Sequence, residues 1–355
     1  MAVNIIGCMS GSSLDGLDIA LCRFEDQHES PSWKILLSQT ITFPSNLAEQ
    51  LKQAPLFSSS DLLALDVLFG QFIGDEIRKW MDEHHVSADL IASHGHTVFH
   101  DPARHFTFQI GNGSAIALAT NVDTITSFRS ADIAAGGQGA PFAPVADRDL
   151  FPGYDAYLNL GGIVNVSTRR QDGTWQGWDI GPCNQAINHL ARKAGLSYDQ
   201  DGKLARQGKA DVSAAAWLAS LFPFQAGRPK GMSNEEVRQS WITWLDQRHE
   251  PIPDLLATCT EGIALLIHQH LVNISGRILV TGGGAHNTYL IERLRSLHGD
   301  RLQFEVPAND IVDYKECLLM AWLGYLHLHN RAFGIHQITG ATTDTIGGAL
   351  HKATR

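Results

Sequence analysis

The feature that most constrains this chain is a strand pattern, interrupted by glycine turns, that occurs twice. In the first copy, apolar runs at residues 3–9 and 17–24 flank the turn SGSSLDG, and residues 33–43 supply a third strand. Apolar residues at helical spacing then follow in residues 61–84, behind the capping-type side chains of Ser60 and Asp61. Strands followed by a long helix predict an α/β layer.

The second copy begins at residue 156. Strands are predicted at residues 156–160, 163–168 and 174–179, with Gly161 and Gly162 in the first turn. A helix is expected to begin near Pro182, with the proline in its first turn, so Asp179 lies where a strand passes into a helix. This order of elements indicates a degenerate duplication.

A third glycine turn lies further along the chain. Residues 260–271 are predicted to form a helix, and the strand at residues 277–281 runs directly into Gly282, Gly283 and Gly284. At 355 residues the chain has room for two domains. The repeat assigns residues 1–128 with 336–355 to the first lobe and residues 129–335 to the second.

Composition narrows the class of protein. Hydrophobic residues make up 44% and charged residues 18%, as in ordinary globular proteins, and the formal charge of −10 argues against a nucleic-acid surface. The 5 cysteines are scattered without a CxxC pair, which argues against disulfides and a thiolate zinc site. The chain starts without a basic leader and has no run of 18 apolar residues. We therefore expect a cytoplasmic protein without a membrane partner.

The glycine turns are suited to phosphate binding. Glycine lets the backbone approach an anion closely, and serine hydroxyls add donors. The spacing matches neither a Walker A loop nor a Rossmann turn, and a plain hairpin turn is the alternative for any one loop.

In a duplicated fold, two hairpins facing one cleft would clamp a triphosphate, while GGGAHN would flank the base or ribose. This arrangement predicts a two-domain, actin-like ATPase with a duplicated ribonuclease H-like fold and an interdomain active-site cleft. The predicted nucleotide contacts are Gly11, Ser12, Ser13, Leu14, Asp15, Gly16, Leu17, Asp18, Gly161, Gly162, Gly282, Gly283, Gly284 and Asn287.

Several blocks together resemble one family. Seven blocks are similar, in sequence and order, to those of anhydro-N-acetylmuramic acid kinases: GCMSGSSLDGLD, SHGHTVFHDP, FQIGNG, SFRSADIAAGGQGAP, NLGGIVN, WDIGPCN and TGGGAHN. The resemblance implies an enzyme of peptidoglycan recycling that uses ATP, Mg²⁺ and water to convert a 1,6-anhydro sugar into its 6-phosphate. It also implies a homodimer.

The resemblance assigns roles to particular side chains. Asp179 would be the general base that deprotonates the attacking water, whereas the residues alone favour an ordinary helix cap. Arg129 and Asp132 would contact the sugar, with an ordinary ion pair as the alternative. Thr97 and Glu316 complete the implied sugar contacts.

Metal binding is predicted only through the nucleotide. HGHxxxH crowds His94, His96 and His100 together, but no acidic or thiolate partner stands at a zinc-site spacing. Mg²⁺ bound with ATP needs mainly phosphate oxygens, water and one or two carboxylates. Asp15, Asp18 and Asp179 are the candidates that the sequence offers, without a ranking.

The chain departs from the family pattern at a few positions. His96 stands where Gln is usual, which adds a titratable group, while Ser12 replaces Thr and Cys183 replaces Gly. Residues 227–237 also differ, and this bears on the choice of sugar. The alternatives are therefore a kinase of another 1,6-anhydro sugar, such as levoglucosan, and an ATP-gated binding module.

Overall fold

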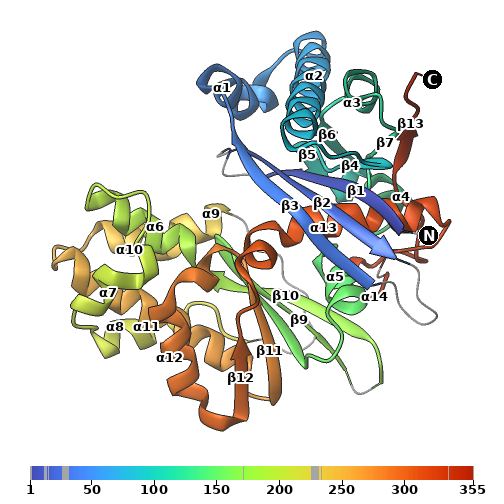
Figure 1. Ribbon diagram of the computed structural model, residues 1–355. Helices are drawn as coiled ribbons and strands as arrows, with labels where there is room; N and C mark the ends of the chain where they lie inside the picture. The colour runs from blue at the N-terminus through green and yellow to red at the C-terminus, as the bar shows by residue number, and fades with distance from the viewer. Residues whose placement is uncertain are drawn as a thin grey trace. The chain divides into compact units, whose positions relative to one another are not determined.

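The structure is a computed structural model that divides into two compact units (Figure 1). It describes residues 2–11, 14, 16–25, 32–170, 172–224, 232, 234–334 and 336–354, so the predicted contacts Ser12, Ser13 and Asp15 lie outside the described residues. Unit 1 comprises Met1–Phe151 and Tyr314–Arg355, and unit 2 comprises Pro152–Asp313. The second boundary falls inside helix α13 (Asn309–Leu328), where Tyr314 adopts φ −118° and ψ 18° instead of helical angles.

Unit 1 is built on a six-stranded sheet in the order β13-β7-β4-β1-β2-β3. The first three strands of the chain are antiparallel neighbours, while β4 is parallel to β1 and β7 is parallel to β4. A separate ribbon pairs β5 with β6. The strands are β1 (Ala2–Ser10), β2 (Gly16–Glu25), β3 (Ser32–Thr42), β4 (Leu90–Ser93), β5 (His96–Asp101), β6 (Phe106–Ile110), β7 (Thr124–Thr126) and β13 (Ala349–His351).

Helices pack against this sheet. The long helix α2 (Ser59–His84) buries its apolar side in the core formed with β1 and β2, and its N-terminus is capped by Ser58, whose hydroxyl accepts from the Asp61 N–H. Helix α13 approaches β1 closely, because a Cβ at Gly7 would overlap the Cys317 carbonyl. The other helical segments of unit 1 are α1 (Ser45–Gln53), η1 (Ala54–Leu56), η2 (Pro102–Arg104), α3 (Gly113–Thr120), α4 (Ser130–Ala134), α5 (Ala143–Leu150) and α14 (His336–Thr339).

Unit 2 contains a five-stranded sheet in the order β10-β9-β8-β11-β12. Its strands β8, β9 and β10 are antiparallel neighbours, and β11 is parallel to both β8 and β12. The strands are β8 (Ala156–Leu160), β9 (Ile163–Arg169), β10 (Trp175–Pro182), β11 (Gly276–Thr281) and β12 (Leu302–Glu305).

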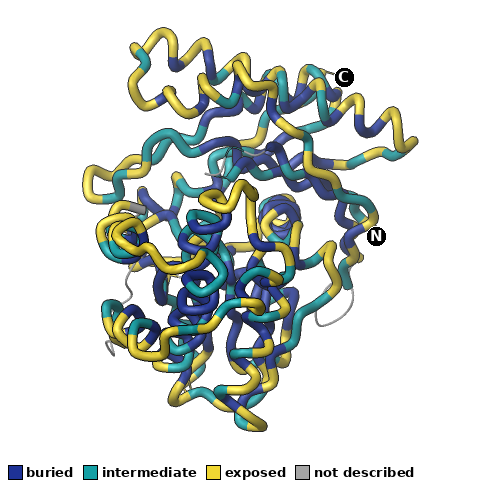
Figure 2. The backbone as a smooth tube through the Cα atoms, turned by 90° about the vertical axis from the view of Figure 1, so that its left-hand side faces the viewer, coloured by how far each residue is buried: buried dark blue, intermediate teal, exposed yellow. Residues whose placement is uncertain are grey.

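The helices of unit 2 surround α11 (Ile252–His270), whose residues are buried along most of its length. Figure 2 colours the backbone by burial and shows buried segments inside with exposed segments around them. This helix begins earlier than the predicted residue 260, because Pro253 lies in its first turn and Leu255 and Leu256 extend its buried face. The other helical segments are α6 (Asn184–Lys193), η3 (Gln200–Gly202), α7 (Lys203–Gln207), α8 (Val212–Ser220), α9 (Asn234–Val237), η4 (Arg238–Ile242), α10 (Thr243–Asp246), η5 (Gly283–His286), α12 (Thr288–His298) and η6 (Gly299–Arg301).

One local prediction is wrong. Pro182 is the last residue of strand β10 and pairs with Ile163, so it does not lie in the first turn of the next helix. The register shifts between Asp179 and Gly181, which allows the strand to continue past the bulge to the proline at its end.

The two sheets repeat one strand order. In each sheet, three strands are antiparallel neighbours, and two further strands continue the sheet in parallel beside the strand that comes first in the chain. The order is β3-β2-β1-β4-β7 in unit 1 and β10-β9-β8-β11-β12 in unit 2. This confirms the predicted α/β class with a duplicated, ribonuclease H-like plan, which is that of the actin-like ATPases.

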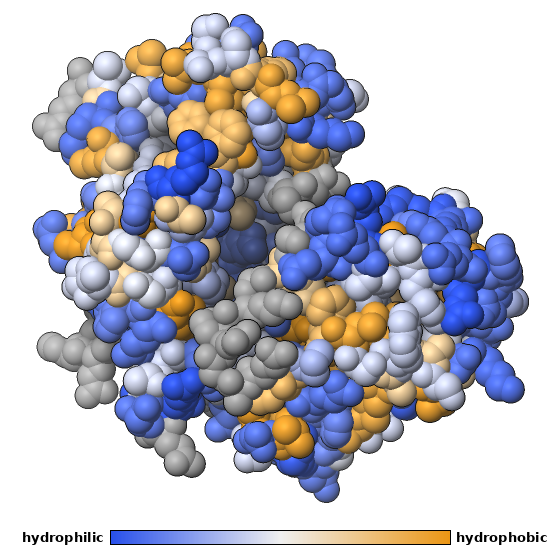
Figure 3. Space-filling view, turned by 180° about the vertical axis from the view of Figure 1, so that it is seen from behind, coloured by the Kyte–Doolittle hydropathy of each residue, from blue (hydrophilic) through white to orange (hydrophobic). Residues whose placement is uncertain are grey.

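One face of the molecule can be followed in a space-filling view. In the view of Figure 3, hydrophobic side chains form separate groups among hydrophilic ones. In the described part of the chain, none of the helices has the length and hydropathy needed to span a bilayer.

Candidate functional site

The first glycine turn connects β1 to β2 in unit 1. The hairpin register pairs Ser10 with Leu17, and within the turn Leu14 adopts φ 58° and donates its N–H to the Gly11 carbonyl at 3.3 Å. Gly16 is required by packing, since a Cβ there would press on the backbone of Ile41. The Leu17 side chain is buried in the core, so it offers no side-chain contact to a ligand. The sequence could not separate these structural roles from ligand contacts.

Asp18 begins a polar chain on the neighbouring strands. Its Oδ1 accepts from the Thr40 hydroxyl at 2.5 Å, and the Thr40 oxygen lies 3.3 Å from the Tyr314 hydroxyl at the kink of α13. Glu316 follows on the same helix. Surrounding protein atoms, and then the Asp18 charge, raise the pKa of Glu316, although its side chain keeps solvent-accessible surface. Two carboxylates that repel one another are suited to sharing a cation.

Arg129 is held by two groups of unit 1. Its Nε donates to His94 Nε2 at 3.0 Å, and its Nη1 donates to the Gly139 carbonyl at 2.9 Å. Burial lowers the pKa of Arg129, while Glu316 acts in the opposite direction. The guanidinium ion also lies 6.0 Å from the centre of the Phe142 ring.

Asp132 is bound to the same loop as Arg129. The residue is 1% exposed, its Oδ2 accepts from the Gly139 N–H at 2.7 Å, and its Oδ1 accepts from the Thr339 hydroxyl at 2.8 Å. Arg129 and Asp132 thus bind the carbonyl and the amide of Gly139, respectively, and these contacts replace the ion pair that the sequence allowed between them. Gly139 adopts φ 66°, which favours glycine there.

The strand pair β5–β6 places the other polar residues of the SHGHT block. Thr97 accepts a weak hydrogen bond from Gln109 at 3.4 Å, and it remains partly exposed. The Nδ1 of His96 lies 3.2 Å from the Ser10 hydroxyl, so the histidine that replaces Gln connects this block to the first glycine turn. His100 Nδ1 contacts the Thr107 hydroxyl at 3.1 Å. The three imidazoles of the block therefore have different protein partners.

Asp179 lies in unit 2 on strand β10, beside the bulge. Its Oδ2 accepts from the Met232 N–H at 2.7 Å, and the side chain is half-buried. Burial is the main cause that raises its pKa, the Glu236 charge adds to it, and the Met232 hydrogen bond opposes it. The helix cap that the sequence allowed is absent, because the N-cap of α6 is Cys183, without a side-chain cap bond.

The second and third glycine turns lie side by side in unit 2. The Gly162 carbonyl accepts from the N–H groups of Cys183 and Gln185, which docks the β8–β9 turn on the start of α6. A Cβ at Gly282 would overlap Asn159 Oδ1, a Cβ at Gly284 would overlap Leu160, and Gly282 has φ 80°. Close packing therefore favours glycine at both positions.

Asn287, a predicted nucleotide contact, has a structural function. Its Oδ1 accepts from the Leu290 N–H at 3.0 Å and caps α12, and the residue is 7% exposed. A predicted nucleotide contact therefore sets the start of the helix that follows the third turn.

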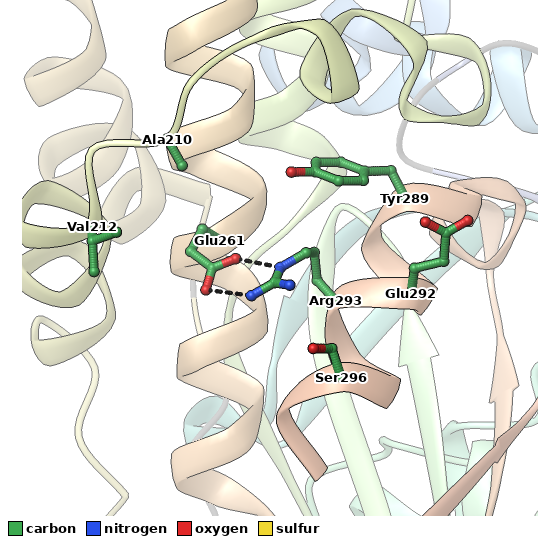
Figure 4. Close-up of a pocket in the computed structure, with 7 residues that line it drawn as sticks. All are labelled: Ala210, Val212, Glu261, Tyr289, Glu292, Arg293 and Ser296. Carbon is green, nitrogen blue, oxygen red and sulfur yellow. Dashed lines mark hydrogen bonds and ion pairs between the residues drawn. The ribbon is translucent and has the colours of Figure 1, made fainter. Parts of the chain in front are cut away.

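A pocket of about 450 Å³ lies elsewhere in unit 2 (Figure 4). Among the lining residues, Glu261 accepts two hydrogen bonds from Arg293, and Glu292 accepts two from Arg206. The charged side chains that line it thus have partners, and the lining includes none of the predicted site residues.

Sequence reasoning missed three polar contributors. His94 was considered only as a metal ligand, whereas the structure pairs it with Arg129. Thr40 and Thr339 carry no motif, and they reach Asp18 and Asp132 only through folding. The single available signal was the position of His94 in the block that also contains Thr97.

Comparison with known proteins identifies the family. The family model described as anhydro-N-acetylmuramic acid kinase matches residues 3–353. The chain is 34% identical to the protein of that name from Pseudomonas syringae pv. syringae, covering 98% of this chain and 99% of the relative. It is 32% identical to the one from Sulfurovum sp., covering 98% of each. A solved structure, the activator of 2-hydroxyisocaproyl-CoA dehydratase from Clostridium difficile, is similar at 12% identity and a TM-score of 0.47, covering 92% of this chain and 96% of that one. With its family model matched over nearly the whole length, this chain belongs to the anhydro-N-acetylmuramic acid kinase family.

Proposed function

We propose that this chain uses ATP and water to convert 1,6-anhydro-N-acetylmuramic acid into N-acetylmuramic acid 6-phosphate. A water oxygen would bond to C1 as the C1–O6 bond breaks, and O6 would then attack the γ-phosphorus with release of ADP. The kinase activity rests on membership of the family. The hydrolytic step rests on a carboxylate that can accept the proton of the water.

Asp179 is the residue that carries this proposal. One of its oxygens is fixed by the Met232 N–H, and the other makes no hydrogen bond to the described residues, so it is available to a water molecule. A raised pKa makes the ionised carboxylate a stronger base. A rigid strand beside a bulge also supports the precise positioning that general base catalysis needs.

ATP would be bound by the three glycine turns. The first belongs to unit 1, and the two in unit 2 lie beside each other, where their glycines permit close backbone approach. Mg²⁺ bound with the nucleotide fits Asp18 and Glu316: burial and then the Asp18 charge raise the pKa of Glu316, and a dication would relieve the second of these effects. The ion would neutralise phosphate charge, while the protein positions the reacting groups.

The sugar would be bound by residues of unit 1. Arg129 supplies a buried cation for the lactyl carboxylate, Thr97 a hydroxyl group, and Glu316 a carboxylate that accepts from sugar hydroxyls. Asp132 would act mainly through the loop at Gly139, because both of its oxygens bind groups there or on Thr339. We also propose a cytoplasmic homodimer, which light scattering on the purified protein tests directly.

The test uses purified protein, Mg-ATP and candidate sugars in oxygen-18 water. We expect N-acetylmuramic acid 6-phosphate that carries the label at C1. Phosphorylation without label would contradict the hydrolytic step, and faster turnover of levoglucosan would assign a different substrate. ATP hydrolysis without any sugar product would instead indicate a binding module.

The base is tested by Asp179→Asn. Turnover should fall at least about a thousandfold, as expected for loss of a general base together with its charge. ATP binding, measured by calorimetry, should persist. Asp300→Asn, at an exposed aspartate of the same unit, is the matched control and should behave like the wild type. Near-normal turnover of Asp179→Asn would assign the base to another carboxylate.

A further inference from the structure

The guanidinium group of Arg129 is fixed by an imidazole that the catalytic mechanism does not use. His94 Nε2 accepts from Arg129 Nε at 3.0 Å, and the Gly139 carbonyl accepts from Nη1 at 2.9 Å. Nη2 makes no hydrogen bond within the described ranges. Two of the three guanidinium nitrogens are therefore bound by the protein, and the third remains available to a ligand.

The hydrogen bonds of His94 determine its tautomer. Its Nδ1 lies 3.1 Å from the Gly95 carbonyl, which can only accept, so Nδ1 must carry a proton. Its Nε2 faces the Nε–H of Arg129, which can only donate, so Nε2 must be unprotonated. The imidazole is therefore neutral, with a lone pair directed at the arginine.

The surroundings of His94 favour this neutral form. The residue is 5% exposed, and burial together with the Arg129 charge lowers its pKa to about 3. His96 and His100 also disfavour a second charge, and only the Gly95 carbonyl opposes them. His94 thus keeps its acceptor throughout the physiological pH range.

We propose that His94 is a positioning residue for substrate recognition: as a neutral acceptor it orients Arg129 so that Nη2 binds the carboxylate of the substrate. The proposal rests on the proposed function, since it requires a sugar that carries a carboxylate. His94 itself touches no reacting atom. Its effect therefore depends on Arg129 and on the charged group of the substrate.

Two substitutions separate the hydrogen bonds of His94. Asn is expected to retain a donor near the position of Nδ1 but to lose the acceptor for Arg129, whereas Gln places an oxygen near the position of Nε2. His94→Asn should raise KM for the anhydro sugar acid about 10- to 100-fold, as loss of a hydrogen bond to a charged group predicts. For His94→Gln, KM for the anhydro sugar acid should stay within about threefold of the wild-type value. KM for ATP should be unchanged in both variants.

The carboxylate is tested with 1,6-anhydro-N-acetylglucosamine, which lacks the lactyl group. His94→Asn should leave KM for this sugar unchanged, because no carboxylate is present to bind Arg129. In the Arg129→Met background, His94→Asn should not raise KM for the anhydro sugar acid any further. An equal loss for both sugars, or additive effects of the two substitutions, would overturn the proposal.

Controls separate this proposal from general damage and from failure of the proposed function. His85→Asn changes an exposed histidine in the left-handed region, φ 53°, which Asn tolerates, and it should match the wild type. Long-range ¹H–¹⁵N spectra of the free protein should show an unprotonated Nε2 on His94 at neutral pH, and a protonated Nε2 would overturn the proposal without any substrate. Wild-type protein that turns over neither sugar contradicts the proposed function, whereas normal wild-type turnover with an unaltered His94→Asn contradicts only the role of His94.

Discussion

Asp132→Asn tests whether this aspartate acts through the loop at Gly139. The side chain is 1% exposed, and its oxygens accept from the Gly139 N–H at 2.7 Å and from the Thr339 hydroxyl at 2.8 Å. The amide can keep its oxygen on Gly139 and present its NH₂ group to the hydroxyl oxygen of Thr339, so both contacts survive without the charge. Each of the two hydrogen bonds then contributes about 1 kcal/mol less to stability, the difference between a charge-assisted and a neutral hydrogen bond.

The expected loss in the free energy of unfolding is therefore about 2 kcal/mol. For a unit in the size class of 150 to 250 residues this corresponds to a decrease in melting temperature of about 4 to 8 °C. Urea unfolding and calorimetry measure both quantities. Asp132→Ala removes both contacts and leaves the Gly139 N–H without its partner, so it should cost about 4 kcal/mol.

The sugar KM provides the second readout for Asp132. Because the Gly139 carbonyl also binds Arg129, a displaced loop should raise the sugar KM while leaving that for ATP unchanged. Asp82→Asn, at an exposed position of α2, is the control and should change neither stability nor KM. A higher sugar KM at unchanged melting temperature would refute the reasoning and indicate direct contact of Asp132 with the sugar.

Three further predictions concern the second unit. Gly282→Ala should cost more than about 2 kcal/mol and weaken ATP binding, because φ is 80° and the new Cβ would overlap Asn159 Oδ1; wild-type stability in urea would contradict this. Burial, His268 and Arg301 lower the pKa of His298 from 6.5 to about 4, so its contribution to stability is complete above pH 6.5 and is lost as pH falls toward 4. His298→Asn, which does not titrate, should show a weaker pH dependence of unfolding over that range. Glu236→Gln removes a charge that raises the pKa of Asp179, so the acid limb of the kcat/KM profile should move to lower pH, and an unmoved limb would argue against Asp179 as the base.

Local sequence signals predicted the strands and helices well where one element decides its own structure. Two apolar runs predicted β1 and β2, and the glycines between them predicted the turn, because both depend on neighbouring residues. The strand before Asp179 was predicted for the same reason, but its continuation to Pro182 was not. That extension depends on a bulge and on pairing with Ile163, which no local pattern encodes.

The sequence offered a set of candidate site residues, which stay predictions, but not the interactions among them. Arg129 and Asp132 were predicted as sugar contacts from their block, yet only the structure shows that both bind Gly139. The partners His94 and Thr339 come from distant parts of the chain. Side chains of this kind meet only when the sheet and its helices have packed.

The sequence by itself determined the duplicated strand plan, the three glycine turns and the resemblance that led to the family. All of these depend on the order and spacing of residues that are close in the chain. Tertiary structure alone decided which groups share a hydrogen bond and which carboxylates repel. Asp18, Thr40 and Tyr314 illustrate the difference, because their contacts join two strands to a helix more than 270 residues further along the chain. Burial has the same origin: the lowered pKa of His94 and the raised pKa of Asp179 arise from surrounding atoms that only the folded chain brings together.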